Sequence, residues 1–301
     1  QTRSMLNWIL VQSEYGQLGN RIHTHANLLA FCIENKINFL NLSFSQYANL
    51  FEEVKGQGAD RFIFKRDFLS YAVKIRFIIS FCRKILRSDK WLRRLSPWIK
   101  MHSVHEDETI NSTDLIKIIS KNRFCRVLVL RDWNISCPDE IRNHGVKIKS
   151  ILTPAASFRY KAESSVDKLR LEFDTLVGVH ARRGDYKNYM SGAYFYPWEQ
   201  YADWINQTRE VLISEGAIKV GFLICSDEPT PKEMMLDLPA NQTMPGNPIE
   251  DLHALSLCDY LMGPPSSFGT WASWYGDVPK LTLIADLQIT NHNQFTRTLH
   301  C

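Results

Sequence analysis

Short apolar runs alternate with helical patterns along much of the chain. Near the amino end, the run from Trp8 to Gln12 precedes a glycine-bearing turn, a helical pattern from Ile22 to Glu34 and a second apolar run from Ile37 to Leu42. Short apolar runs are typical of buried strands, whereas apolar positions three and four residues apart are typical of amphipathic helices. Strand, helix and strand in this order predict a βαβ unit, and hence a parallel sheet.

The middle of the chain predicts two more strands and a boundary between domains. Apolar residues favour strands from Arg126 to Leu130 and from Val146 to Leu152. The following stretch, TPAASFRYKAESS, contains Pro154 and several small residues, which favours a linker into a helix from Ser164 to Glu172. At 301 residues the chain is longer than a single core usually grows, so we expect an amino-terminal domain of residues 1–155 and a carboxy-terminal domain of residues 156–301.

Strands and helices alternate again in the second half of the chain. The predicted strands are Leu176 to Ala181, Lys219 to Cys225, Tyr260 to Met262 and Lys280 to Ile284, and the helices between them are Trp198 to Ser214, Ile249 to Cys258 and Phe268 to Tyr275. This alternation predicts a doubly wound α/β sheet. Ligands bind such sheets at the carboxyl ends of the strands, so the residues that follow each strand are the candidates for function.

Polar side chains follow three of these strands. They are His180, Arg182, Arg183 and Asp185 after the first strand, Asp227 and Glu228 after the second, and Ser266 and Ser267 after the third. Arginines bind phosphate oxygens through two hydrogen bonds at once, and serines at a helix start offer hydroxyls beside free backbone N–H groups. A carboxylate such as Asp227 can accept hydrogen bonds from the N1–H and NH₂ groups of a guanine. Together these residues predict a site for a guanosine diphosphate group.

Several common nucleotide motifs are missing from the sequence. It contains neither G-x-x-x-x-G-K-[ST] nor G-x-G-x-x-G, which argues against a P-loop kinase and a dinucleotide-dependent oxidoreductase. It contains no Asp-x-Asp either, so we expect no metal bridge to the diphosphate and no cofactor. The arginines would neutralise the phosphate charge instead.

The motifs resemble those of the α-1,2-fucosyltransferase family. The similar segments are HARRGD at His180 to Asp185, FLICSDEP at Phe222 to Pro229, DLHALSLCDYLMGPPSSFGTWASW at Asp251 to Trp274, and the amino-terminal loop YGQLGNR at Tyr15 to Arg21. The resemblance covers the first 35 or so residues and the stretch from Thr175 to Ile284. It says little about residues 45–150, where the acceptor side is expected.

The resemblance implies a GT-B architecture, in which two Rossmann-like domains flank a cleft, and metal-independent transfer of fucose from GDP-fucose to a glycan with inversion. It also implies a role for each matching residue. Arg182 would hold the β-phosphate, His180 and Asp227 would lie near the nucleoside, Ser266, Ser267 and Phe268 would line the diphosphate, and Gly19 and Asn20 would face it from the amino-terminal domain. Arg183 and Asp185 would bind the donor or form a supporting ion pair.

The sequence does not identify the general base that would take the proton from the attacking hydroxyl. Related core fucosyltransferases carry a glutamate a few positions past the HxRRxD element, but YKNYM offers none here. Asp185 and Glu228 are the candidates, and a loose transition state that needs little base is the third alternative. A transferase of the same fold with another nucleotide sugar, and a catalytically silent nucleotide- or sugar-binding protein, remain alternative functions.

The segment from Lys74 to Lys100 holds nine Lys or Arg residues and one Asp, with apolar residues at roughly helical spacing. Such a basic helical insertion could lie peripherally on an anionic membrane or pack on the amino-terminal domain with its charges in water. No nucleic-acid-binding module accompanies it, so nucleic acid is not an expected partner. The seven cysteines form no Cys-x-x-Cys pair, and a reducing, cytoplasmic location fits them best.

Overall fold

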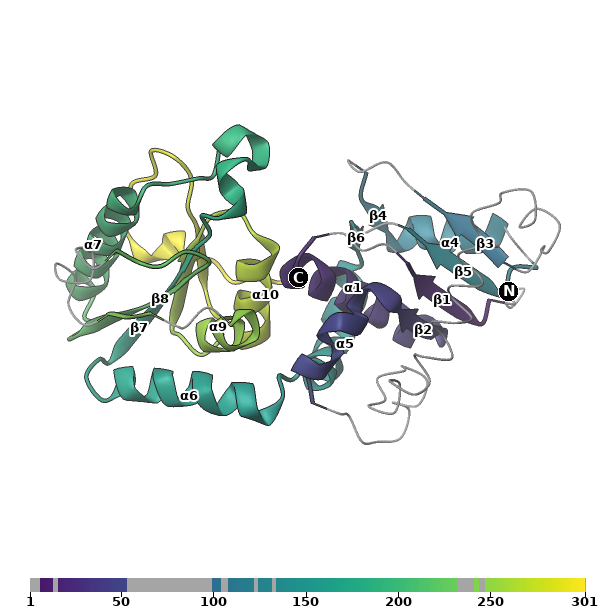
Figure 1. Cartoon of the computed structure of the whole chain (residues 1–301), viewed down its shortest axis with the longest axis horizontal. Coiled ribbons are helices and arrows are strands. Elements are labelled where there is room, and N and C mark those ends of the chain that lie inside the picture. Colours follow the sequence, from purple (N-terminus) through teal and green to yellow (C-terminus); the bar gives the residue numbers. More distant parts are fainter. Residues whose placement is uncertain are drawn as a thin grey trace. The chain divides into compact units, whose positions relative to one another are not determined.

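The computed structural model describes residues 6–12, 16–52, 99–103, 108–121, 124–131, 134–231, 241–243 and 247–300. The chain divides into two compact units, Gln1–Thr153 and Pro154–Cys301, and each contains its own parallel sheet with helices (Figure 1). The predicted basic insertion, Lys74 to Lys100, lies outside the described residues except for its last two, which open a strand. Within the described residues, none of the helices is both long enough and apolar enough to span a bilayer.

The first unit is built on a four-stranded parallel sheet in the order β2-β1-β5-β3. Its strands are β1 (Trp8–Val11), β2 (Asn38–Asn41), β3 (Ile99–His102) and β5 (Val127–Leu130), and β4 (Ile110–Asn111) pairs separately with β6 (Ile135–Ser136). The helices are α1 (Leu18–Asn35), α4 (Ser112–Lys121) and α5 (Pro138–Ile151), and a 3₁₀ segment spans Leu42–Leu50. The predicted βαβ opening is therefore confirmed as β1, α1 and β2.

The predicted strand from Val146 to Leu152 is wrong, because this stretch ends helix α5. Val146 is 89% exposed, whereas Ile141 and Ile148 are fully buried, and this spacing is that of one helical face rather than of a strand. Pro138 at the first helical position and two acidic residues in the first turn favour a helix start at this place. The alternation of apolar and polar residues in VKIKSIL thus arises by chance within a helix.

The predicted linker is also mostly helical. Helix α6 begins at Ala156 and ends at Arg170, eight residues earlier at its start than the expected Ser164. Its buried residues, Ala162, Val166 and Leu169, recur at helical spacing across both the supposed linker and the expected helix. Small residues after Pro154 therefore start a helix here.

The second unit contains a five-stranded parallel sheet in the order β11-β10-β7-β8-β9. The strands are β7 (Thr175–Ala181), β8 (Val220–Ser226), β9 (Asn241–Thr243), β10 (Tyr260–Gly263) and β11 (Lys280–Thr282), and the helices are α6 (Ala156–Arg170), α7 (Trp198–Ser214), α9 (Pro248–Leu255) and α10 (Ser267–Gly276). The doubly wound sheet that the alternation predicts is confirmed in this unit.

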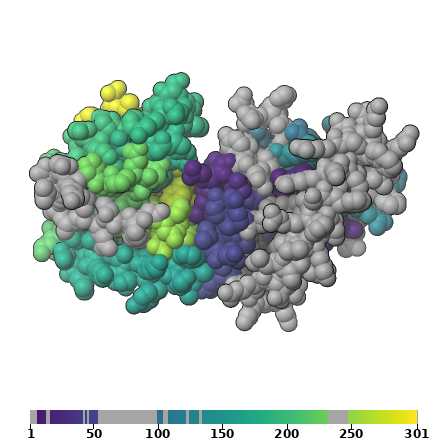
Figure 2. Space-filling view, viewed as in Figure 1, coloured from purple at the N-terminus to yellow at the C-terminus, as the bar shows by residue number. Residues whose placement is uncertain are grey.

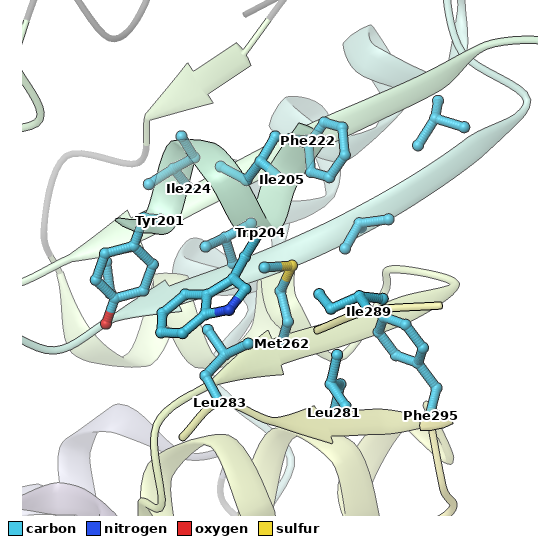
Figure 3. Packing of buried hydrophobic residues seen from close by; sticks show 14 of the residues in the cluster. Tyr201, Trp204, Ile205, Phe222, Ile224, Met262, Leu281, Leu283, Ile289 and Phe295 are labelled. Atoms are coloured by element: carbon cyan, nitrogen blue, oxygen red, sulfur yellow. The ribbon is translucent and has the colours of Figure 1, made fainter. Parts of the chain in front are cut away.

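Two apolar clusters cover the two faces of this sheet. Val177 and Val179 of β7 belong to one cluster with Trp204 of α7 and Met262. Figure 3 shows Trp204 and Met262 in this cluster. Leu176 packs on the opposite face with residues of α6, α9 and α10. Successive residues of a strand point to opposite faces, so His180 shares the face of these three helices. Helix α6 lies along one margin of this unit in Figures 1 and 2, which share one view.

The α7 face also anchors the segment that follows the last strand. Trp204 is fully buried, and its indole N–H donates a hydrogen bond to the carbonyl of Leu287 at 3.0 Å. Ile289 and Phe295 complete this cluster from the same segment (Figure 3). The sheet is thus enclosed on both faces, and the strand ends at its carboxyl edge carry the candidate residues.

Candidate active site

The carboxyl ends of β7 and β8 bring two of the sequence motifs side by side. In the parallel register His180 lies opposite Cys225, and Ala181 lies opposite Ser226. The loop HARRGD therefore leaves the sheet next to the turn that carries Asp227 and Glu228. On the other side of β7, strand β10 ends at Gly263 and leads through Pro265 into α10.

Asp227 holds the loop after β7 by its backbone. Its Oδ1 accepts a hydrogen bond from the backbone N–H of Arg183 at 2.7 Å, and its Oδ2 accepts one from the N–H of Gly184 at 3.1 Å. Each carboxylate oxygen retains a further lone pair. The contact of Asp227 with a guanine remains a prediction. In the structure Asp227 holds the backbone of the loop that carries Arg182 and Arg183.

Arg182 makes an ion pair with Asp185 three residues on. Nε lies 2.9 Å from Oδ1, and Nη2 lies 2.5 Å from Oδ2, so the guanidinium binds the carboxylate with two hydrogen bonds. These hydrogen bonds hold the pKa of Asp185 below its usual value. The side chain of Arg182 is 17% exposed, and its guanidinium lies over the ring of Tyr186, 4.7 Å from the centroid.

Arg183 is a structural partner of Glu228. Its Nε lies 3.1 Å from Oε2 of Glu228, and its guanidinium also donates a hydrogen bond to the carbonyl of Tyr196. The rings of Phe195 and Trp198 lie 4.5 and 5.0 Å from the guanidinium carbon, and the side chain is only 12% exposed. Of the two alternatives for Arg183 and Asp185, the mutual ion pair is not formed, because each arginine pairs with a different carboxylate.

Neither predicted base has the pKa of a good proton acceptor. Glu228 accepts a hydrogen bond from Lys187 at 2.8 Å, and this contact, followed by the one from Arg183, lowers the pKa of Glu228. Asp185 is likewise held in its ionised form by Arg182. A carboxylate with a lowered pKa is a weak base, so neither Asp185 nor Glu228 is prepared to act as a general base by its contacts in this structure.

A third carboxyl group, that of Asp251, has a pKa raised to about 7. Asp251, in the first turn of α9, is only 6% exposed, and burial raises its pKa to about 7, with a smaller contribution from Glu250. Its Oδ1 has no hydrogen-bond partner within the described residues. The sequence signal for this residue was a lone acid in the apolar stretch DLHALSL, which is a weak signal.

The start of α10 has the serine cap that the sequence predicts. Ser266 is the N-cap residue, and its hydroxyl accepts the backbone N–H of Phe268 at 3.2 Å, while Ser267 is the first helical residue. The ring of Phe268 lies on the ring of His180, with 4.9 Å between centroids. The positive end of a helix with a serine cap favours an anion at this place.

Tyr186 joins the arginine loop to the start of α10. Its ring lies under the guanidinium of Arg182, and its hydroxyl donates a hydrogen bond of 2.5 Å to the carbonyl of Pro265, the residue before the helix cap. Tyr186 is 4% exposed. Sequence reasoning missed this residue, because a tyrosine after a polar motif carries no pattern of its own.

His180 is half-buried, and its ring is neutral. Burial, followed by the nearby charges of Arg182 and Lys280, lowers the pKa of His180 to about 3. Gly263 of β10 lies so close that a Cβ there would be 2.8 Å from the carbonyl oxygen of His180. The imidazole therefore acts as an uncharged hydrogen-bonding group in this site.

Gly19 and Asn20 belong to the first unit, in the first turn of α1. The turn before the helix is made by Gly16, which has a φ of +68° and accepts a hydrogen bond from Nε of Arg21 at 3.0 Å. The contact of Gly19 and Asn20 with a diphosphate stays a prediction. Across the described residues, no three His, Cys, Asp or Glu side chains are grouped to hold a metal ion.

The fold is that of the GT-B class. No family model matches the chain, and no curated protein matches it. Solved structures do: a GDP complex of a mutant of FUT1 from Arabidopsis thaliana is similar with a TM-score of 0.61 and 14% identity, over 98% of this chain and 75% of that one. NodZ, a fucosyltransferase from Bradyrhizobium, has a TM-score of 0.54 and 12% identity, over 94% and 96% of the two chains.

A complex of POFUT1 with GDP-fucose is also similar, with a TM-score of 0.52 and 13% identity over 92% of this chain and 96% of that one. These structures are GT-B-type fucosyltransferases with the same α/β architecture. At such low identity the likeness establishes the fold, and it confirms the fold class that the sequence predicts.

Proposed function

We propose that this chain is a glycosyltransferase that moves fucose from GDP-fucose to a glycan hydroxyl, with inversion and without a metal. The NodZ and POFUT1 structures with GDP-fucose, and the FUT1 structure with GDP, are of proteins that bind this donor or its product. The α-1,2 linkage comes from the motif resemblance alone, because NodZ is an α-1,6-fucosyltransferase. The linkage is therefore the most specific part of the proposal, and it depends on the sequence motifs alone.

One observation carries the proposal, which is the contact of Tyr186 with both Arg182 and the start of α10. The tyrosine joins Arg182 to a serine-capped helix start, and an arginine beside such a helix start is suited to bind a diphosphate. Asp227 fixes the backbone of the same loop. These contacts support the proposal that the site binds a diphosphate, which would displace Asp185 from Arg182.

The transfer follows from this arrangement. As the bond between fucose C1 and the β-phosphate oxygen breaks, negative charge grows on departing GDP, and Arg182 and the N-terminus of α10 stabilise it. An acceptor hydroxyl attacks C1 from the opposite face and forms the new glycosidic bond. With Asp185 and Glu228 both held in ion pairs, the hydroxyl passes its proton to solvent water late, after most of the bond to GDP has broken.

Location and membrane contact form a separate proposal. The segment from Lys74 to Lys100 suits a cytoplasmic enzyme that meets anionic membranes from their surface. Sedimentation with anionic but not with neutral vesicles is the expected result. Equal sedimentation with both would end this proposal.

Calorimetry of four nucleotides tests the donor. GDP, GDP-fucose, GDP-mannose and UDP-galactose are titrated into the wild type and into Arg182→Ala, with EDTA throughout. We expect GDP-fucose to bind and the substitution to weaken binding by about 2 to 5 kcal/mol, as for a desolvated charged contact. If no guanine nucleotide binds, or if Arg182→Ala binds as well as the wild type, the proposal fails.

Two further outcomes separate the alternatives. Preference for a different sugar nucleotide would favour a transferase of the same fold with another donor. Binding of GDP-fucose without transfer to any glycan and without slow hydrolysis to fucose and GDP would identify a catalytically silent binding protein. The assays for transfer and hydrolysis are necessary because both candidate bases, Asp185 and Glu228, are held in ion pairs.

A further inference from the structure

A buried lysine lies beside His180 under the first turn of α10. Lys280 is the first residue of β11 and is only 9% exposed, and burial lowers its pKa to about 8. Among the described residues, its ammonium group makes no hydrogen bond and no ion pair. Burying an unpaired ammonium is costly, so a lysine at such a place needs an explanation.

The strand register directs this side chain toward the active site. Lys280 lies opposite Leu261 in the sheet, and Leu261 packs on the face that α10 covers. The end of the lysine then reaches Gly269: a Cβ at Gly269 would lie 3.3 Å from Cε of Lys280 and 3.8 Å from its Nζ. The same point would lie 3.7 Å from Nδ1 of His180, so the ammonium and this ring nitrogen approach one spot.

His180 presents an unpaired nitrogen at that spot. Its Nδ1 is buried without a hydrogen-bond partner in the described part of the chain, and its low pKa keeps the ring neutral. A neutral imidazole has one nitrogen that donates and one that accepts. An ammonium group can only donate. Beside Lys280, Nδ1 is therefore suited to accept, and the proton belongs on Nε2.

We propose that Lys280 is a positioning residue for nucleotide binding, which holds Nδ1 of His180 as an acceptor and thereby fixes the Nε2–H tautomer that donates to the bound nucleotide. Both groups lie within 4 Å of the same point beside Gly269, so the contact requires the flexible end of the lysine to turn toward the ring. The last step rests on the proposed function. The tautomer itself is a property of the protein without ligand.

Few other charges reach His180. Arg182 and Asp185 act on it from the loop after β7, and Lys280 acts on it from β11. The adjoining stretches of β10 and α10, Leu261 to Gly263 and Ser267 to Thr270, contain no titratable side chain. Deprotonation of Lys280 is thus the change expected near this histidine between pH 7 and 9. A bound diphosphate favours the charged lysine, so affinity should fall as the pH rises through about 8.

Nitrogen NMR of the ligand-free protein tests the contact itself. Long-range ¹H–¹⁵N spectra distinguish the two neutral tautomers, and His180→Gln assigns the signal among the nine histidines. We expect the Nε2–H form in the wild type and in a surface control, Lys168→Met, and a mixture of both tautomers in Lys280→Met. An Nδ1–H form in the wild type would overturn the proposal, whatever the protein binds.

Calorimetry with GDP then tests the consequence. We expect the affinity of the wild type to fall about tenfold between pH 7 and 9.5, which corresponds to a one-unit change in the lysine pKa on binding. Lys280→Met should bind weakly at both pH values, and Lys280→Arg, which stays charged, should restore tight binding without the pH dependence. Wild-type affinity in Lys280→Met, or a pH profile shared by all three proteins, would refute the role. Absence of GDP binding to the wild type would instead refute the proposed function and leave the NMR result standing.

Discussion

Asp227 and Gly184 are matched across the edge of the sheet. The backbone N–H of Gly184 donates to Oδ2 of Asp227 at 3.1 Å, and a Cβ on Gly184 would lie 3.0 Å from that same oxygen. The glycine of HARRGD therefore lets the loop approach the carboxylate of the next motif. Two motifs that are over forty residues apart in the chain form one structural unit.

Substitution of Asp227 tests this unit. Asp227→Ala leaves two backbone N–H groups without their acceptor, so we expect a loss of about 1 to 3 kcal/mol in the free energy of unfolding. GDP affinity should fall as well, because the loop carries Arg182. Chemical denaturation and calorimetry measure the two effects, with Asp167→Ala on the exposed side of α6 as control. Unchanged stability would show that the two hydrogen bonds contribute nothing.

Gly263 should be sensitive to a single methyl group. Gly263→Ala places a Cβ 2.8 Å from the backbone oxygen of His180, a distance at which the strand must move. We expect lower stability and at least tenfold weaker GDP binding. Gly269→Ala, whose Cβ would meet the flexible end of Lys280 at 3.3 Å, should cost much less stability, although its methyl group would occupy the point that Lys280 and His180 share and should therefore also weaken GDP binding. Similar losses of stability in the two variants would contradict the close packing of His180.

The hydroxyl of Tyr186 should contribute to both stability and GDP binding. Tyr186→Phe retains the stack under Arg182 but removes the hydrogen bond to the carbonyl of Pro265. The expected cost is about 1 kcal/mol in stability, together with weaker GDP binding, because the arginine loop loses its tie to α10. Tyr160→Phe on the exposed surface of α6 is the matched control. Equal GDP affinity in Tyr186→Phe and the wild type would show that the tie is dispensable.

Asp251 should make the stability depend on pH. Its pKa in the folded chain is raised to about 7, so its contribution to stability is complete below its ordinary pKa near 4 and is lost as the pH rises through 7. Relative to Asp251→Asn, the wild type should lose up to about 4 kcal/mol between pH 4 and 8. Urea denaturation at several pH values measures this difference. Parallel pH profiles for the two proteins would contradict a raised pKa.

The histidines act in the opposite direction. Burial lowers the pKa of His25 and His180 to about 3, so their contribution is present above pH 6.5 and is lost as the pH falls toward 3. Comparing the wild type with Asp251→Asn cancels this contribution, since both proteins retain the two histidines.

Periodicity predicted the second unit well and failed in two places in the middle of the chain. The helix from Trp198 to Ser214 was predicted with its observed bounds, because its apolar stripe is long and has clear ends. Val146 to Leu152 misled because four apolar residues in seven suit both a strand and a helix. Only the helix start signal at Pro138, eight positions before Val146, distinguishes the two.

The candidate site was predicted as a set of residues but not as a set of pairs. Sequence order placed Arg182, Arg183, Asp185 and Glu228 at one edge of the sheet, yet which arginine meets which carboxylate depends on the direction in which the loop turns after β7. Lys280 and Tyr186 were missed for a related reason. Each lies near the site only because one long side chain extends to a residue distant in the sequence, and no spacing in the sequence predicts such a contact.

The pairing of Arg182 with Asp185 also affects how a ligand would leave. A cation that already has a carboxylate partner exchanges one anion for another when a phosphate arrives, so arrival and departure are both substitutions. As the phosphate withdraws, Asp185 is three residues away to take its place, and the guanidinium is never left bare in a poorly solvated site. A built-in counter-ion of this kind would weaken the retention of a bound phosphate and ease its release.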